Sequence, residues 1–288
     1  SLKSTFPQFL EMERRGGLLV GLRRRPKQAA ETGDISLFMT LKGGLCRLTD
    51  SLAAKLPAGT LQYGQAVRSL SRRGGVWMAA TDKGVFEADS VISALPANVL
   101  APLVGDLDAE LSAALGEIPF SSTATVSLAY DAKSFSGRVE GFGFLVPKGH
   151  DCRITAATFV SSKFPGRVAR DVVLIRCFMG GAGREDQTQA GEGALAETAA
   201  VELGRIMGLG EVRPLWSLVA KWPRANPQYT VGHALRLERI ASRLESHPGL
   251  VLAGASYRGI GLPDCIRSGR QAAAQALKAA ANAAAGVC

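Results

Sequence analysis

The stretch LVLAGASYRGIGLPDCIRSGRQAA (residues 250–273) decides the fold of this chain. An apolar run typical of a buried strand is followed by a turn containing Gly259 and Gly261, and then by an Ala-rich helical pattern. Pro263 suits the first turn of that helix, where a backbone N–H is not needed. Such a unit directs backbone N–H groups and the positive end of the helix dipole towards one point. We therefore expect an anionic or electron-rich ligand beside this turn, although the same pattern also occurs where a turn serves only packing.

The composition indicates a folded, basic protein. The chain has 288 residues, of which 47% are hydrophobic and 20% charged, so it can bury the core of one or two domains. The formal net charge is +9, but the basic residues are scattered except between Arg23 and Lys27, so we expect no nucleic-acid partner. The five cysteines and three histidines show no metal-ligand spacing, which predicts buried, reduced thiols and no metal site.

The rest of the chain alternates between strand and helix patterns. Apolar runs separated by RRGG (residues 72–75) and DKG (residues 82–84) predict β-hairpins. Residues 121–179 are mostly strand-like, and residues 191–209 have the apolar spacing of a helix. Residues 212–233 indicate a strand that enters an irregular, proline-marked loop. This order predicts an α/β fold of mixed α+β character.

Two further segments are candidates for the border of a planar ligand. The segment ADSVISALPANVL (residues 88–100) ends a strand at small residues that include Ala94, which leaves room for a flat molecule but also suits an ordinary strand end. The segment KWPRANPQYT (residues 221–230) holds Trp222 among prolines, close in sequence to Tyr229. A tryptophan in a rigid loop can form the wall of a ligand site, and it is equally often a core residue.

Together these segments resemble the protoporphyrinogen oxidases, within the amine-oxidase and phytoene-desaturase superfamily of flavoproteins. The strand–turn–helix at residues 250–273 resembles the family's C-terminal flavin-contacting motif. The remaining matches follow in the family's order and cover nearly the whole chain. They are LKGGLCRLTDSLAAKL (residues 41–56, the GG helix), VFEADSVISALPA (residues 85–97, the strand returning to the flavin), GFGFLVP and IRCFMGG (residues 141–147 and 175–181, strands of the porphyrinogen pocket) and KWPRANPQYTVGH (residues 221–233, the tryptophan loop).

The superfamily opens with a strand, a G-x-G-x-x-G turn and a helix that hold the pyrophosphate of FAD. No such unit stands near this N-terminus, so we expect the chain to be the C-terminal portion of a longer flavoprotein. The resemblance implies that residues 1–27 end a helical membrane-binding region. It implies that residues 28–100 and 225–288 form part of a Rossmann-like FAD-binding domain. Residues 101–224 would form a substrate domain with a mixed, mostly antiparallel sheet and flanking helices.

The resemblance also implies the residues of the site. Those at cofactor-contacting positions are Val67, Ala94, Trp222, Ile260, Gly261, Leu262 and Asp264. Those at porphyrinogen-contacting positions are Gly143, Leu145, Thr158 and Phe178. Gly143 is expected to let a tetrapyrrole approach the backbone, and Leu145 and Phe178 to offer flat apolar surface. The resemblance implies no catalytic acid or base and no metal ligand.

The implied activity is the FAD-dependent oxidation of protoporphyrinogen IX to protoporphyrin IX, by hydride transfer to the flavin, with oxygen as the acceptor. The alternatives are oxidation of amines, carotenoids or coproporphyrinogen, or an inactive portion unable to hold FAD alone. Amine oxidation would need an aromatic cage, for which only Tyr257 and Trp222 are evident. The expected partners are a porphyrinogen and oxygen, with either a second copy of the chain or the missing N-terminal portion. The expected location is the cytoplasm, with peripheral contact to the inner membrane as a further expectation.

Overall fold

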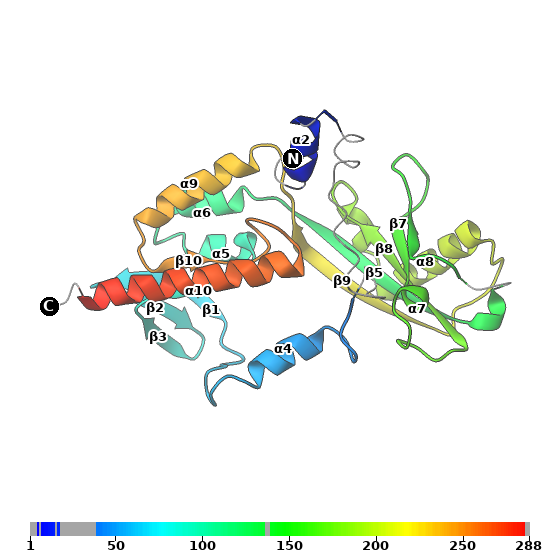
Figure 1. Ribbon diagram of the computed structural model, residues 1–288, viewed down its shortest axis with the longest axis horizontal. Coiled ribbons are helices and arrows are strands. Elements are labelled where there is room, and N and C mark those ends of the chain that lie inside the picture. The colour runs from blue at the N-terminus through cyan, green and yellow to red at the C-terminus, as the bar shows by residue number, and fades with distance from the viewer. Residues whose placement is uncertain (1–4, 6, 15, 18–38, 136–138, 286–288) are drawn as a thin grey trace. The chain divides into compact units, whose positions relative to one another are not determined.

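The chain forms two compact units (Figure 1). The computed structural model describes residues 5, 7–14, 16–17, 39–135 and 139–285, so the basic segment at Arg23–Lys27 lies outside the described residues. Contacts between residues assign 1–30, 61–120 and 227–288 to unit 1, and 31–60 and 121–226 to unit 2. The expected domains have different boundaries, since they placed residues 31–60 with the cofactor portion and residues 101–120 with the substrate portion.

Unit 1 contains a three-stranded antiparallel sheet of consecutive strands. These are β1 (Val67–Arg73), β2 (Val76–Thr81) and β3 (Gly84–Ala88). Gly74 and Gly75 join the first two strands with φ angles of 56° and 90°, a region that glycine occupies without a steric penalty. The hairpins predicted from the glycine-containing turns are therefore confirmed.

Trp77 on β2 is fully buried in the core of unit 1. Its indole N–H donates a hydrogen bond to the carbonyl oxygen of Pro248 at 3.1 Å, which satisfies the polar edge of the ring. Helices α5 (Ala97–Leu103) and α6 (Ala109–Gly116) pack into the same core. This packing explains why residues 101–120 belong to unit 1.

Unit 1 also contains a parallel pair of strands, β4 (Val91–Ser93) and β10 (Leu250–Leu252). The long helix α10 (Leu262–Ala285) follows β10 and buries small side chains against it, as the predicted strand–turn–helix requires. Helix α9 (His233–Glu245) precedes β10, and the short helix α2 (Pro7–Arg14) lies near the N-terminus of the chain.

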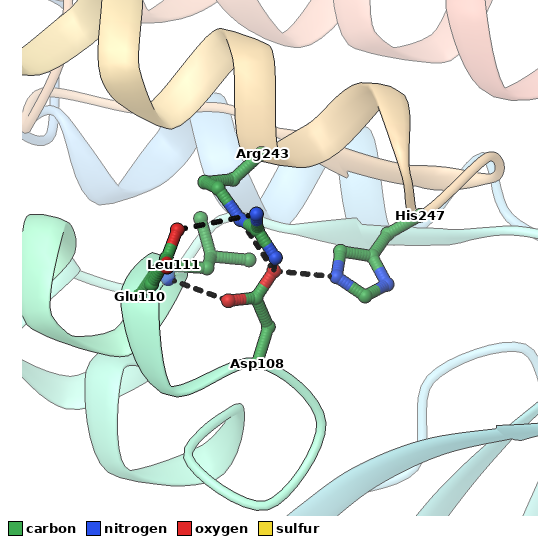
Figure 2. A network of polar contacts seen from close by, with 5 residues as sticks. All are labelled: Asp108, Glu110, Leu111, Arg243 and His247. Carbon is green, nitrogen blue, oxygen red and sulfur yellow. Dashed lines mark hydrogen bonds and ion pairs between the residues drawn. The ribbon is translucent and has the colours of Figure 1, made fainter.

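One buried carboxylate joins α6 to the C-terminal end of α9 (Figure 2). Asp108 is the N-cap of α6 and accepts a hydrogen bond from the backbone N–H of Leu111 at 2.9 Å. Its other oxygen accepts from Arg243 at 2.8 Å and lies 2.7 Å from Nε2 of His247. Burial acts to raise the pKa of Asp108, but these hydrogen bonds outweigh it and hold the pKa well below its usual range.

Unit 2 is built on a five-stranded sheet in the order β6-β7-β8-β5-β9. The strands are β5 (Phe120–Asp131), β6 (Gly143–Leu145), β7 (Ile154–Phe159), β8 (Val172–Gly180) and β9 (Trp216–Pro227). The pairs β6–β7, β7–β8 and β8–β5 are antiparallel, as predicted. The shorter helical elements of the unit are α4 (Cys46–Ala53), a 3-10 turn at Ala132–Ser134, α7 (Val160–Lys163) and a second 3-10 turn at Glu185–Thr188.

Helix α8 (Glu192–Met207) covers one face of this sheet. It buries Leu195, Ala199 and Leu203 in a core shared with β5, β7 and β8. The carboxylate of Glu202 on the same helix accepts hydrogen bonds from the backbone N–H groups at the start of β7, at 2.8–2.9 Å. The helix therefore packs on the sheet and also fixes the start of β7.

The structure differs from the sequence analysis in two segments between residues 212 and 245. The irregular, proline-marked loop expected within residues 212–233 begins later than its prolines indicate, because β9 continues through Pro223 to Pro227 and the irregular stretch is residues 228–232. The strand is at an edge of the sheet, where proline removes no essential ladder hydrogen bond. Helix α9 was not predicted, although Leu237, Ile240 and Leu244 recur at helical spacing within it.

The cysteines differ in their environments. Cys152 and Cys177 are buried, as predicted, and burial raises the pKa of the Cys177 thiol to about 12. The expectation of burial is wrong for Cys46, which is exposed on α4, while Cys265 is half-buried and Cys288 lies outside the described residues. Among the described helices, none is both long enough and apolar enough to span a bilayer.

Candidate functional site

The carboxyl ends of β4 and β10 lie side by side in unit 1. The backbone N–H of Ala253 donates to the carbonyl oxygen of Ser93 at 2.9 Å. A Cβ placed on Gly254 would lie 3.6 Å from the carbonyl oxygen of Ala94. The small residues that follow the two strands are therefore neighbours at the edge where parallel α/β sheets bind their ligands.

The glycine-rich turn follows directly and leads into α10. Gly259 has a φ of 115°, and a Cβ there would lie 2.5 Å from the carboxyl carbon of Asp264, so only glycine fits. The side chains of Ile260 and Leu262 at the tip are 63% and 50% exposed. Asp264 lies in the first turn of α10 and forms an ion pair with Arg267 at 2.7 Å. The turn thus brings together four predicted cofactor residues, Ile260, Gly261, Leu262 and Asp264, around an accessible tip.

Two residues that the sequence analysis did not assign to the site hold the segment before this turn. The hydroxyl of Tyr229 donates to the carbonyl oxygen of Ala255 at 2.6 Å and accepts from the backbone N–H of Gly259 at 2.8 Å. Nε2 of His233 lies 2.9 Å from the carbonyl oxygen of Tyr257. The two rings stack with centroids 4.1 Å apart, and burial lowers the pKa of His233, which favours the neutral ring. Their hydrogen bonds go to alternate residues of this segment, namely Ala255, Tyr257 and Gly259. We therefore call Tyr229 and His233 the aromatic clamp.

The variant Tyr229→Phe should loosen the turn without removing the ring stack. The phenyl ring keeps its contact with His233, but the backbone N–H of Gly259 loses its hydrogen-bond acceptor. We expect that amide to exchange with solvent deuterium about tenfold faster. Tyr63→Phe, at a tyrosine of unit 1 that is 80% exposed, is the matched control. Unchanged exchange at Gly259 in Tyr229→Phe would show that the hydroxyl does not hold the turn.

A cavity of about 580 Å³ lies between α9, β10 and the first turns of α10. Its lining includes Tyr257, Arg258 and Asp264, so it borders the clamped segment. Ile260 and Leu262 do not line it. The cavity is therefore separate from the exposed tip of the turn.

In unit 2, the strand register brings the four predicted substrate residues together. Gly143 on β6 pairs with Thr158 on β7. Leu145 pairs with Ala156, which in turn pairs with Phe178 on β8. Because side chains alternate along a strand, all four lie on the face of the sheet opposite to α8, in two adjacent rows. We call this surface the open face of the sheet.

Gly143 has a structural requirement of its own within this face. Its φ is 138°, and a Cβ there would lie 1.9 Å from the carbonyl oxygen of Ala157. The backbone of β6 therefore approaches β7 more closely than any other residue would permit. This close approach explains the glycine without reference to a ligand, while its expected role beside a tetrapyrrole stays a prediction.

The other two predicted cofactor residues lie elsewhere. Val67 is the first residue of β1 in unit 1, is half-buried and packs against the core around Trp77. Trp222 lies on β9 of unit 2, and the residue is 51% exposed. Both stay predictions. Within the described part of the chain, no three His, Cys, Asp or Glu side chains are grouped as a metal site.

Comparisons with known proteins agree with this architecture. Residues 1–277 match the family model described as flavin containing amine oxidoreductase. The chain is 32% identical to the coproporphyrinogen III oxidase of Bacillus subtilis (strain 168) and 34% identical to the protoporphyrinogen oxidase of Homo sapiens, over 96% of its own length in each case. A crystal structure from Exiguobacterium sp. 255-15, provisionally described as a protoporphyrinogen oxidase, superposes with a TM-score of 0.82 at 29% identity, covering 96% of this chain and 59% of that one.

The chain therefore belongs to the flavin containing amine oxidoreductase family, whose members are oxidoreductases with FAD as cofactor. It spans about 60% of the length of the curated relatives that it matches. The residues present suit a flavin: Gly259 lets the main chain form a tight, exposed turn, and the 24-residue helix α10 begins at that turn. The first N–H groups of a helix have no intrahelical acceptor, so they can face an electron-rich ring edge.

Proposed function

We propose that the chain supplies the flavin-contacting turn and the substrate-binding sheet of an oxygen-dependent porphyrinogen oxidase. The observation that carries this proposal is the register of β6, β7 and β8, which groups Gly143, Leu145, Thr158 and Phe178 on the open face. A flat surface with apolar side chains suits a tetrapyrrole macrocycle. Similarity to both proto- and coproporphyrinogen oxidases supports the substrate class.

FAD, when bound, would accept a hydride from the porphyrinogen. The chain's own contribution would be at the turn Ile260–Leu262, where the main chain and the N-terminus of α10 meet the electron-rich edge of the ring system. The positive end of the helix dipole stabilises negative charge at that edge. Ala94 would border the cofactor from β4, with Trp222 and Val67 as further contacts.

Unit 2 would bind and orient the substrate. Leu145 is 82% exposed, and Phe178 lies two strands away in the same row, beyond Ala156, so both can contact a macrocycle laid on the open face. Burying these apolar surfaces would also exclude water from the reacting carbon. No side chain is assigned as a general acid or base, since hydride transfer depends on orientation and on the electronics of the cofactor.

We further propose that the activity needs a second polypeptide segment that carries a dinucleotide-binding G-x-G-x-x-G turn. This chain does not match about 40% of the length of the relatives, and such a segment would lie in that part. Helix α4 has an unburied apolar stripe that includes Leu52, and Leu45 and Leu56 continue it on either side, with exposed fractions of 45–59%. A complementary segment or a second copy of the chain would cover this stripe.

The absorption spectrum of the purified chain tests the cofactor assignment. FAD would be added to the chain alone, and to the chain joined to the portion of the Bacillus subtilis relative that it does not match. We expect flavin bands near roughly 375 and 450 nm to remain with the joined protein after removal of free FAD. Absence of bound flavin in both preparations would contradict the proposed function.

In the joined protein, Gly261→Trp should abolish flavin retention. A Cβ at this glycine would already lie 3.1 Å from Asp264, and the indole would occupy the space beside the turn. Gly269→Trp is the matched control, because Gly269 lies on α10, the helix that begins one residue after Gly261, and nothing lies within 4 Å of a Cβ placed there. Equal flavin content in the two variants would show that the turn does not contact the cofactor.

A further inference from the structure

Arg176 lies on the open face of the sheet in unit 2, on the central strand. It belongs to β8, and its Cα is in register with Thr158 on β7 and with Ser127 on β5. Gly143 on β6 continues the same row beyond Thr158. Arg176 therefore shares a row with two of the predicted substrate residues, although the sequence did not mark it as a site residue.

The guanidinium of Arg176 has no acidic partner among the described residues. Its Nε lies 3.4 Å from the hydroxyl oxygen of Ser127, which is long for a hydrogen bond. The ion pairs formed by the described residues of the chain involve other arginines and a histidine. Its neighbours in the row are small or hydroxylated side chains that cannot neutralise its charge. An arginine in this setting can receive a carboxylate from a ligand in a bidentate geometry.

The adjacent row of the open face is mostly apolar. It contains Leu145, Ala156 and Phe178, followed by Thr125 on β5. Successive rows on one face lie roughly 7 Å apart, because two residues of a strand separate them. The open face therefore combines an apolar strip for a flat ring system with a cation beside it for an acidic substituent.

We propose that Arg176 is a specificity-determining residue that binds a peripheral carboxylate of the porphyrinogen and favours the more highly carboxylated substrate. The proposal rests on the porphyrinogen oxidation proposed above and names the substrate class of that site. Coproporphyrinogen carries carboxylate-bearing side chains where protoporphyrinogen carries vinyl groups. Both substrates share two further carboxylate side chains, so the proposal places Arg176 beside the positions at which they differ. A cation there stabilises the carboxylate of coproporphyrinogen and offers nothing to a vinyl group, and the titration below decides between it and the protoporphyrinogen expected from the sequence.

Fluorescence titration with coproporphyrin III and protoporphyrin IX tests the proposal, because these oxidised porphyrins emit light and their binding does not depend on bound flavin. The titrations would use the full chain and the chain joined to the portion of the Bacillus subtilis relative that it does not match. We expect Arg176→Gln to weaken coproporphyrin binding by about tenfold to a hundredfold and to change protoporphyrin binding by less than about threefold. Arg176→Lys should retain part of the preference, since it keeps the charge but not the bidentate geometry.

Arg170→Gln is the matched control, because Arg170 is an exposed arginine just before β8 and lies outside the open face. It should change neither affinity. Equal weakening for both porphyrins in Arg176→Gln, or no change for either, overturns the role of Arg176 while leaving porphyrin binding intact. If the unsubstituted proteins bind neither porphyrin, the proposed function itself fails, and the role of Arg176 fails with it.

Discussion

Asp108→Ala is expected to lower the free energy of unfolding of unit 1 by about 2–4 kcal/mol. The substitution removes the N-cap of α6 and leaves the backbone N–H of Leu111 without its acceptor. It also removes the carboxylate that receives hydrogen bonds from Arg243 and His247. These partners come from sequence positions 135 and 139 residues away, so their loss separates elements that only the folded chain brings together. Urea-induced unfolding measures the effect.

Two controls separate the contributions. Asp108→Asn keeps a capping oxygen but loses the charge, so it should cost clearly less than the alanine variant. Asp82→Ala breaks an ion pair with Arg68 whose side chains are 50% and 66% exposed, and it should leave the unfolding midpoint almost unchanged. An alanine variant at Asp108 that resembles Asp82→Ala in stability would show that the buried network contributes little.

The acid sensitivity of unit 1 follows from the same carboxylate. The pKa of Asp108 is lower in the folded chain than its unfolded value of about 3.9. The stabilisation is therefore fully present above that unfolded value and is lost as the pH falls towards the folded pKa. Between pH 4 and pH 2, stability should fall more steeply for the unsubstituted chain than for Asp108→Asn. Parallel pH profiles would contradict this assignment.

Gly143→Ala is expected to detach β6 from β7, at a local cost above about 3 kcal/mol. The added Cβ would lie 1.9 Å from the carbonyl oxygen of Ala157, and backbone on both sides would have to move. Two hydrogen bonds flank the contact, from the N–H of Val146 to Thr155 and from the N–H of Phe159 to Phe142. Deuterium exchange at these two amides should accelerate by more than a hundredfold.

Gly141→Ala provides the matched control. Gly141 has a φ of 85°, also in the region that favours glycine, but nothing lies within 4 Å of a Cβ placed there. Its substitution should cost only the backbone strain of about 1 kcal/mol. If the two alanine variants exchange at the same rate, the close approach of β6 to β7 is not what requires glycine at position 143.

Much of the fold could be predicted from the sequence where a local pattern determines the element. The turn residues at 72–75 and 82–84 specify the hairpins, and the run at 250–273 specifies the strand–turn–helix of unit 1. The course of β9 could not be predicted, because Pro223 and Pro227 indicate a loop unless the strand is known to be at an edge. The join between α6 and α9 depends on Asp108 and Arg243, which are too far apart in sequence for any local signal.

The same distinction applies to the site. The sequence identified the residues of the turn because glycine and proline there have a local conformational meaning. It did not assign a role in the site to Tyr229 or His233, whose hydrogen bonds go to main-chain groups about 25 residues away. Arg176 was missed because its significance depends on the register of neighbouring strands, which alternation along one strand does not reveal.

The three tryptophans of the chain are divided between environments that an optical experiment can distinguish. The indole of Trp77 is enclosed in unit 1, whereas Trp216 and Trp222 of unit 2 are 46% and 51% exposed. An enclosed indole emits at shorter wavelength and is shielded from dissolved quenchers such as iodide, while the other two rings meet them directly. The intrinsic tryptophan fluorescence therefore reports on each unit separately. The unfolding of unit 1 can be distinguished from that of unit 2 without any added dye.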